Sequence, residues 1–166
     1  EHLAGDRPAT KLVRTFSLPL PAKRGEGRGE GPIRYTDFAE PDILHMGDVF
    51  FNGLFPVIDP GSGGSVEGYL AAMKETLGRI GDKTRIIPGH GEMGDKAALQ
   101  RQIAMLEGAI KAVQARIKAG DTLQQAIAKK PLKPWAGFAW SFISEDTFTT
   151  LLYNGLAKYD RNMQVI

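Results

Sequence analysis

Cysteine is absent from the 166-residue chain, and histidine occurs only three times. The lack of cysteine excludes disulfide frameworks, thiolate-bound zinc and thiol catalysis. No apolar run approaches the roughly 20 residues that a membrane-spanning helix needs, and no signal peptide is visible, so we expect no membrane partner. The formal net charge of +2 is too small to favour nucleic acid. We therefore expect a soluble protein, cytoplasmic or periplasmic, without a nucleic-acid partner.

Two segments of different composition divide the chain. We predict that residues 1–32 are a low-complexity N-terminal segment or linker, because residues 18–32 are rich in glycine, proline and charged side chains and offer no apolar face. One short strand is expected before that stretch, at Lys11–Phe16. A tail for an anionic partner is the weaker alternative, since glutamate alternates with arginine there. Residues 33–166 have the apolar periodicity of a folded domain.

Hydrophobic periodicity predicts the elements of this folded part. Strands are expected at Ile33–Phe38, Asp42–Met46 and Thr84–Ile87. Helices are expected after the capping residues Ser65, Asp95, Thr122 and Ser144, and the one from Asp95 to Gly120 has the clearest amphipathic pattern. Packed loops are expected at Phe50–Ile58 and Trp135–Phe142, and a turn at Pro88–Gly91. Alternation of strand, helix and strand indicates an α/β layer architecture.

Asp48 and His90 are the two side chains best placed for chemistry. Each follows a predicted apolar strand, and ligands usually bind at strand ends in α/β sheets. Carboxylate and imidazole are both metal ligands, and the glycines beside His90 allow close backbone approach. Taken singly, each residue has a plainer interpretation: His90 as a surface residue in a glycine turn, and Asp48 as a turn or helix cap.

Together, the motifs of the folded part resemble those of the metallo-β-lactamase superfamily, most closely a group of bacterial hydrolase-like members. The motifs are His45-Met46-Gly47-Asp48-Val49-Phe50-Phe51-Asn52-Gly53, then Asp59, then Ser62-Gly63-Gly64-Ser65, then Thr84-Arg85-Ile86-Ile87-Pro88-Gly89-His90-Gly91. The resemblance extends from about Thr36 to the C-terminus. Its most specific part is the Gly-Asp and Pro-Gly-His-Gly pair, whose Asp48 and His90 stand forty-two residues apart.

The resemblance implies roles for these residues. Asp48 matches the family's bridging or second-site carboxylate, and His90 matches a second-site histidine. His45 is not one of the usual ligands, and the resemblance makes it a strand residue or a supporting residue behind the ligands, with a ligand role as the weaker alternative. The implied fold is half of an αββα sandwich, with its sheet covered by the C-terminal helices.

The family's His-x-His-x-Asp-His motif is absent from the sequence, as is the further histidine usually found before the Gly-Asp strand. The chain therefore resembles the C-terminal half alone. A hydrolytic zinc site needs about three protein ligands and an open position for water. Two ligands predict a weak, incomplete zinc site, and no catalytic residue is assigned.

Two functions remain open at this point. The first is a truncated metal-dependent hydrolase homologue, inactive as an isolated chain. The second is a non-catalytic association module or inactive remnant. A single half leaves one sheet face uncovered, so we expect as partner either a second copy or a complementary N-terminal half.

Overall fold

In the described part of the chain, five strands form one mixed sheet, and they lie side by side in chain order. The computed structural model describes residues 13–18, 33–38, 42–58 and 64–163. The strands are β1 (Val13–Leu18), β2 (Ile33–Phe38), β3 (Ile43–Phe51), β4 (Arg85–His90) and β5 (Gly94–Asp95). Only β3 and β4 are parallel; the other neighbouring pairs are antiparallel. The parallel pair brings the ends of β3 and β4 to the same side of the sheet.

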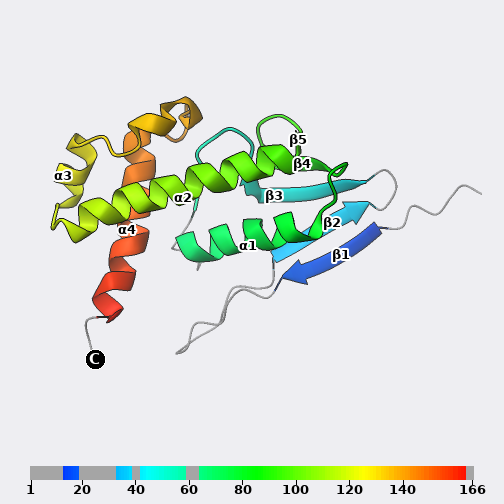
Figure 1. The fold of residues 1–166 in the computed structure, drawn as a ribbon, viewed down its shortest axis with the longest axis horizontal. Coiled ribbons are helices and arrows are strands. Elements are labelled where there is room, and N and C mark those ends of the chain that lie inside the picture. Colours follow the sequence, from blue (N-terminus) through cyan, green and yellow to red (C-terminus); the bar gives the residue numbers. More distant parts are fainter. Residues whose placement is uncertain (1–12, 19–32, 39–41, 59–63, 164–166) are drawn as a thin grey trace, which may run out of the picture.

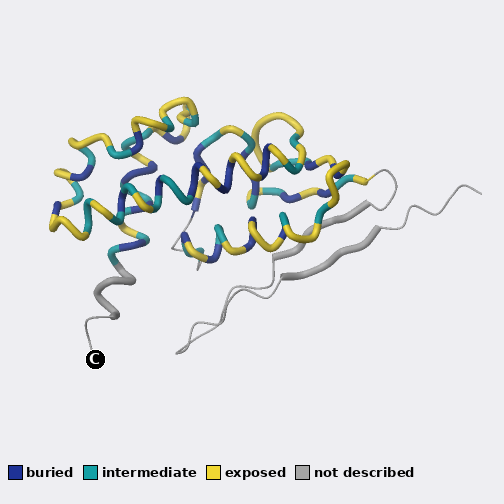
Figure 2. The backbone as a smooth tube through the Cα atoms, in the orientation of Figure 1, coloured by how far each residue is buried: buried dark blue, intermediate teal, exposed yellow. Residues whose placement is uncertain are grey.

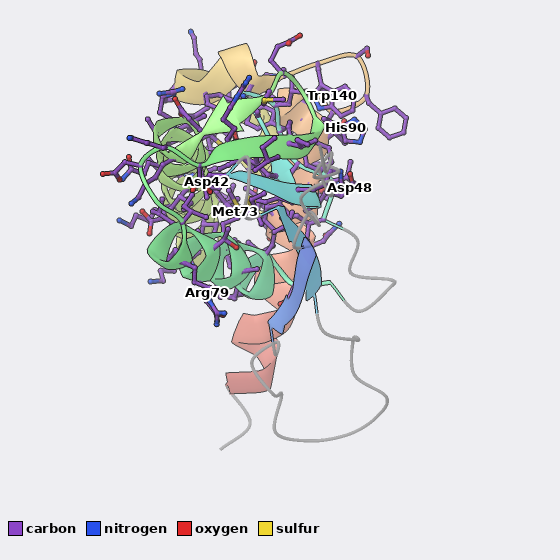
Figure 3. The ribbon with its side chains drawn as sticks, turned by 90° about the vertical axis from the view of Figure 1, so that its right-hand side faces the viewer. Asp42, Asp48, Met73, Arg79, His90 and Trp140 are labelled. Carbon is purple, nitrogen blue, oxygen red and sulfur yellow. The ribbon has the colours of Figure 1, made fainter. Side chains whose placement is uncertain are left out.

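Helices cover one face of this sheet and extend beyond it (Figure 1). They are α1 (Val66–Arg79), α2 (Lys96–Lys118), α3 (Leu123–Ala128), a 3-10 helix η1 (Lys133–Phe138) and α4 (Glu145–Met163). Helix α1 connects β3 to β4, and α2 follows β5 directly. Both helices lie on the same side of the sheet, whereas α3 and α4 pack against the far part of α2 (Figures 1 and 3). The chain is thus a mixed α/β protein.

The core lies between the sheet and these helices, as the buried segments in Figure 2 show. On β3, Leu44 and Met46 are buried while His45 between them is exposed, so the strand alternates between a covered and an open face. The apolar stripe of α2 packs onto the covered face. Its buried residues include Leu99, Ile103, Leu106, Ala109 and Val113. The alternating spacing of four and three residues therefore predicted this helix correctly.

The helix caps also follow the sequence. Ser65 Oγ accepts a hydrogen bond from the Gly68 N–H at 3.0 Å, and Asp95 Oδ1 accepts one from the Ala98 N–H at 2.7 Å. Thr122 and Gln125 form a reciprocal capping box on α3. These bonds satisfy N–H groups that have no partner within the first helical turn. No helix among the described residues is long and apolar enough to cross a membrane.

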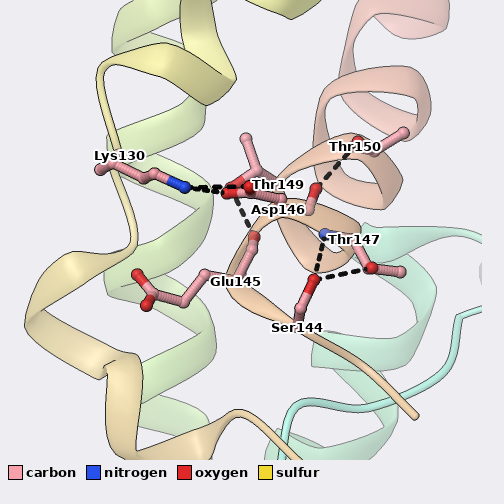
Figure 4. A network of polar contacts seen from close by, with 7 residues as sticks. All are labelled: Lys130, Ser144, Glu145, Asp146, Thr147, Thr149 and Thr150. Atoms are coloured by element: carbon pink, nitrogen blue, oxygen red, sulfur yellow. Dashed lines mark hydrogen bonds and ion pairs between the residues drawn. The ribbon is translucent and has the colours of Figure 1, made fainter. Parts of the chain in front are cut away.

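The start of α4 is tied to the end of α3 (Figure 4). Ser144 Oγ accepts a hydrogen bond from the Thr147 N–H at 3.1 Å, which caps the helix. The Lys130 ammonium donates to both carboxylate oxygens of Asp146, at 2.8 and 2.9 Å, and this contact raises the pKa of Lys130. Lys130 has a positive φ of 49°, an unusual value for a residue other than glycine. The turn after α3 is therefore held in place by an ion pair to the next helix.

Three expectations about element ends were wrong. Strand β3 runs on to Phe51 instead of ending at Met46, because Gly47 (φ 53°) accommodates an irregular register within the strand. Strand β4 includes residues 88–90 instead of turning there, because His90 pairs with Phe51. Part of the expected aromatic loop is the helix η1.

The division of the chain at residue 32 stays a prediction. Strand β1 lies within residues 1–32 and pairs along its whole length with β2, from Val13 opposite Phe38 to Leu18 opposite Ile33. It starts two residues later than the strand expected at Lys11–Phe16. The predicted linker over residues 19–32 lies outside the described residues, as do Asp59, Ser62 and Gly63 of the motif set.

Candidate metal site

Asp48 and His90 face each other across the parallel pair of strands. His90 Nε2 lies 3.5 Å from Asp48 Oδ1, and Figure 3 shows both side chains at the edge of the sheet away from α1. Asp48 stands in β3 after the irregularity at Gly47, and His90 is the last residue of β4. The structure thus brings together the two residues that the sequence pattern selected.

Glycines create the space in which this pair meets. A Cβ atom at Gly89 would lie 2.2 Å from Asp48 Oδ1 and 2.7 Å from the carbonyl carbon of Gly47. Gly91 has a φ of 90°, and a Cβ there would lie 2.4 Å from the backbone oxygen of Asn52. The Asn52 N–H in turn donates to the His90 carbonyl at 2.9 Å. Close backbone approach on both sides of His90 therefore requires the two glycines of the Pro-Gly-His-Gly sequence.

Aromatic rings hold the imidazole of His90. The buried Phe51 ring stacks on it, with centroids 4.5 Å apart and an interplanar angle of 17°. The Trp140 ring lies 5.5 Å away on a tilted plane. Trp140 is itself fixed, because its Nε1–H donates to the Phe55 carbonyl at 3.1 Å. The sequence predicted an aromatic loop around Trp140, but no local pattern indicated that Trp140 contacts His90, fifty residues earlier.

Both candidate ligands are accessible from solvent. The side chain of Asp48 is 77% exposed and that of His90 is 43% exposed. Their donor atoms can therefore be reached by an ion without any movement of the backbone. The exposure also means that the surrounding protein does little to raise the affinity of the pair for a cation, because water screens both groups.

His45 lies on the same strand as Asp48, three residues earlier, and is exposed on the open face of the sheet. Its Cε1 atom lies 3.9 Å from the position that a Cβ at Gly47 would take. Within the part of the chain that the structure describes, no three His, Asp or Glu side chains come together in a group that could hold a metal ion. The described site thus consists of two candidate donors, and the supporting role of His45 stays a prediction.

No protein-family model matches the sequence, and no curated protein matches it. Similar folds are nevertheless found among solved structures. The stereoselective inverting sec-alkylsulfatase Pisa1 from Pseudomonas sp. aligns with 81% of this chain at a TM-score of 0.54 and 15% identity. A double mutant of that enzyme aligns with 73% of the chain at the same TM-score and identity. VMB-1 reaches a TM-score of 0.42 at 22% identity over 59% of the chain, which is too low to establish a common fold.

These similarities concern a part of a larger enzyme. The chain spans only 21–23% of the length of the alkylsulfatase chains that it matches. At 15% identity the likeness shows the fold alone. The described fold is therefore similar to part of the fold of that alkylsulfatase.

Proposed function

We propose that this chain carries one portion of the metal site of a metallo-β-lactamase-fold hydrolase, with Asp48 and His90 as two of the ligands. The observation that carries the proposal is the 3.5 Å approach of His90 Nε2, at the end of β4, to Asp48 Oδ1, within the neighbouring parallel strand β3. In this account the described sheet and helices are half of an αββα sandwich. The remaining ligands come from a second chain, either another copy or a complementary N-terminal half.

The separation of the two donor atoms fits a shared zinc ion. Two ligands of one tetrahedral zinc ion, each with a bond of about 2.1 Å, stand about 3.4 Å apart. The observed 3.5 Å agrees with that value and is longer than an ordinary N–H···O hydrogen bond. Oxygen and nitrogen donors also suit zinc chemically. When bound, such an ion supplies Lewis-acid chemistry for hydrolysis.

The chain's own residues would bind the ion and hold the ligand groups in position. Asp48 contributes a carboxylate from β3, and His90 contributes an imidazole whose orientation Phe51 and Trp140 limit. Two ligands fall short of the roughly three that hydrolytic zinc sites use. We therefore propose that the isolated chain binds zinc weakly and hydrolyses ester, thioester and lactam bonds negligibly.

A zinc titration of four proteins tests the ligand assignment. Calorimetry should show that Asp48→Asn and His90→Ala each weaken zinc binding about tenfold or more relative to the parent chain. Glu67→Gln is the matched control, because it removes an exposed carboxylate on helix α1, away from the pair, and it should leave the zinc affinity unchanged. Equal zinc affinity for the parent and His90→Ala would show that the ion binds elsewhere.

A second candidate function is that of a non-catalytic association module. The observation that favours it is the absence of a third candidate ligand near Asp48 and His90 among the described residues. Helices α1 and α2 cover one sheet face, while His45 and Arg85 are exposed on β3 and β4. We propose that a second copy or a complementary N-terminal half covers the open face. Light scattering of the purified chain tests the association: a dimer supports the module, and a monomer contradicts it.

A further inference from the structure

Phe142 is an exposed aromatic side chain next to the candidate site. Its exposed fraction is 72%, whereas the other exposed large apolar residues among those described, Met93 and Val57, reach 46% and 39%. Its ring packs against Trp140 with centroids 5.7 Å apart at 33°. An aromatic side chain left in water forgoes the stabilisation that burial would give, so this exposure calls for an explanation from function.

The loop that presents Phe142 is anchored to the core on both sides. The Trp140 N–H donates to the Ile143 carbonyl at 3.1 Å, and Ile143 is buried. The Trp140 indole N–H donates to the carbonyl of Phe55, whose own N–H donates to the Phe138 carbonyl at 2.7 Å. The side chain of Phe142 is therefore held outward by a loop that is fixed to the core.

A continuous row of rings joins Phe142 to His90. It runs from the buried Phe51 to His90, then to Trp140, and ends at Phe142 in solvent. Figure 3 shows Trp140 and His90 adjacent, with Asp48 on the same side of the molecule. We name the surface made by Trp140 and Phe142 the aromatic shelf. Because Trp140 contacts both His90 and Phe142, the shelf begins directly beside the candidate site.

The size of the shelf indicates its occupant. An aromatic side chain offers roughly 150–250 Å² of surface, so the half-buried Trp140 and the exposed Phe142 offer a few hundred Å² at most. A stable protein partner needs about 800 Å² on each side. A flat ring of a small molecule needs far less, and aromatic rings stack favourably at the separations seen within the row.

We propose that the aromatic shelf binds an aromatic or flat apolar group of a small ligand whose polar end lies against Asp48 and His90. The inference rests on the proposed function, because it places the shelf beside that site. It assigns Phe142 as the residue that sets ligand preference, through contact with the ligand. Trp140 contacts the ligand as well and positions His90.

The first experiment needs no metal. Saturation-transfer NMR with the intact chain compares 2-naphthamide with acetamide, two neutral amides that differ in the aromatic group. We expect binding of 2-naphthamide alone, and a loss of at least about fivefold in affinity for Phe142→Ala. Trp135→Phe is the matched control, because it alters a half-buried aromatic residue of η1, and it should change the affinity less than twofold, within the scatter for a stacking contact. Equal affinity of 2-naphthamide for the parent and Phe142→Ala would overturn the proposal.

The second experiment adds zinc and compares benzohydroxamate with acetohydroxamate. The phenyl compound should bind more tightly to the parent chain, and Phe142→Ala should abolish that difference. If zinc fails to bind, the proposed function is wrong. The metal-free experiment still shows whether the aromatic shelf binds an aromatic group. If light scattering shows that the parent chain dimerises and Phe142→Ala restores a monomer, the shelf is a protein interface and the proposal is wrong.

Discussion

Gly89 is the residue on which the geometry of the candidate site depends most closely. Its lack of a side chain lets β4 approach β3 where Asp48 stands, and Gly91 allows the same approach at Asn52. The sequence predicted both glycines as places of close backbone contact. It also selected Asp48 and His90, because two short motifs carried local chemical information. The ring contacts of His90 with Phe51 and Trp140 had no such local signal, since they depend on packing between distant segments.

Gly89→Ala should destabilise the fold and disrupt the Asp48–His90 pair. The added Cβ would approach the backbone of Gly47 as well as the carboxylate, so rotation of the Asp48 side chain alone cannot relieve the clash. We expect a loss of about 1–3 kcal/mol in the free energy of unfolding, measured by urea denaturation. Gly137→Ala is the control, because a Cβ there meets nothing within 4 Å, and it should stay within about 0.5 kcal/mol of the parent. Equal stabilities for the two variants would contradict the close packing at Gly89.

Two glycines inside helices should respond in opposite directions to the same substitution. A Cβ at Gly108 in α2 would lie 2.3 Å from a ring carbon of Trp135, whereas one at Gly78 in α1 would meet nothing within 4 Å. Gly78→Ala should stabilise the protein by about 0.5–1 kcal/mol, because alanine is the better helix former. Gly108→Ala should destabilise it by about 1–3 kcal/mol through overpacking. Thermal unfolding of the two variants checks this, and a gain in stability for Gly108→Ala would show that η1 packs differently.

At the scale of elements, helices were predicted more accurately than strands. The stripe and cap of α2 lie within one stretch of sequence, so local periodicity and Asp95 were enough to locate it. The ends of β3 and β4 depend on the pairing of Phe51 with His90, two residues far apart in the chain. A pattern confined to one strand carries no information about such a pair. For this reason the sequence placed turns where the parallel strands continue.

An ion pair joins α1 to α2 and gives the helix contact a dependence on pH. The Lys74 ammonium contacts the Glu107 carboxylate, and this hydrogen bond and the positive charge lower the pKa of Glu107. Because the pKa is lowered in the folded state, the contact stabilises the fold at pH values above the ordinary pKa of a carboxyl group. That stabilisation is lost as the pH falls through the folded-state pKa.

Glu107→Gln should therefore be less stable than the parent at neutral pH and equally stable in acid. The measurement is the midpoint of urea unfolding for both proteins across the range from neutral to acidic pH. Because both groups are partly exposed, added salt should reduce the difference. A difference that persists unchanged in acid would mean that the substitution acts through packing and that the ion pair contributes nothing.

In the whole molecule, the arrangement of sheet and helices determines where the candidate site lies. Helices α1 and α2 pack on one face of the sheet, against β3 and β5, and the candidate donors lie within β3 and at the end of β4. The α/β class followed from the order of elements in the sequence. The expectation of an incomplete metal site came from the resemblance and not from composition or periodicity, and it stays a prediction. Completion of the αββα sandwich by a partner remains a proposal.

Measurement of zinc-dependent turnover decides whether Asp48 and His90 form an incomplete metal site. Hydrolysis of a generic ester and a generic lactam is measured with the purified chain, with and without zinc, alongside His90→Ala. We expect negligible turnover in every sample, because two ligands fall short of a hydrolytic zinc site. Zinc-dependent turnover by the parent chain that His90→Ala abolishes would contradict the account, since further ligands within this chain would then complete the site.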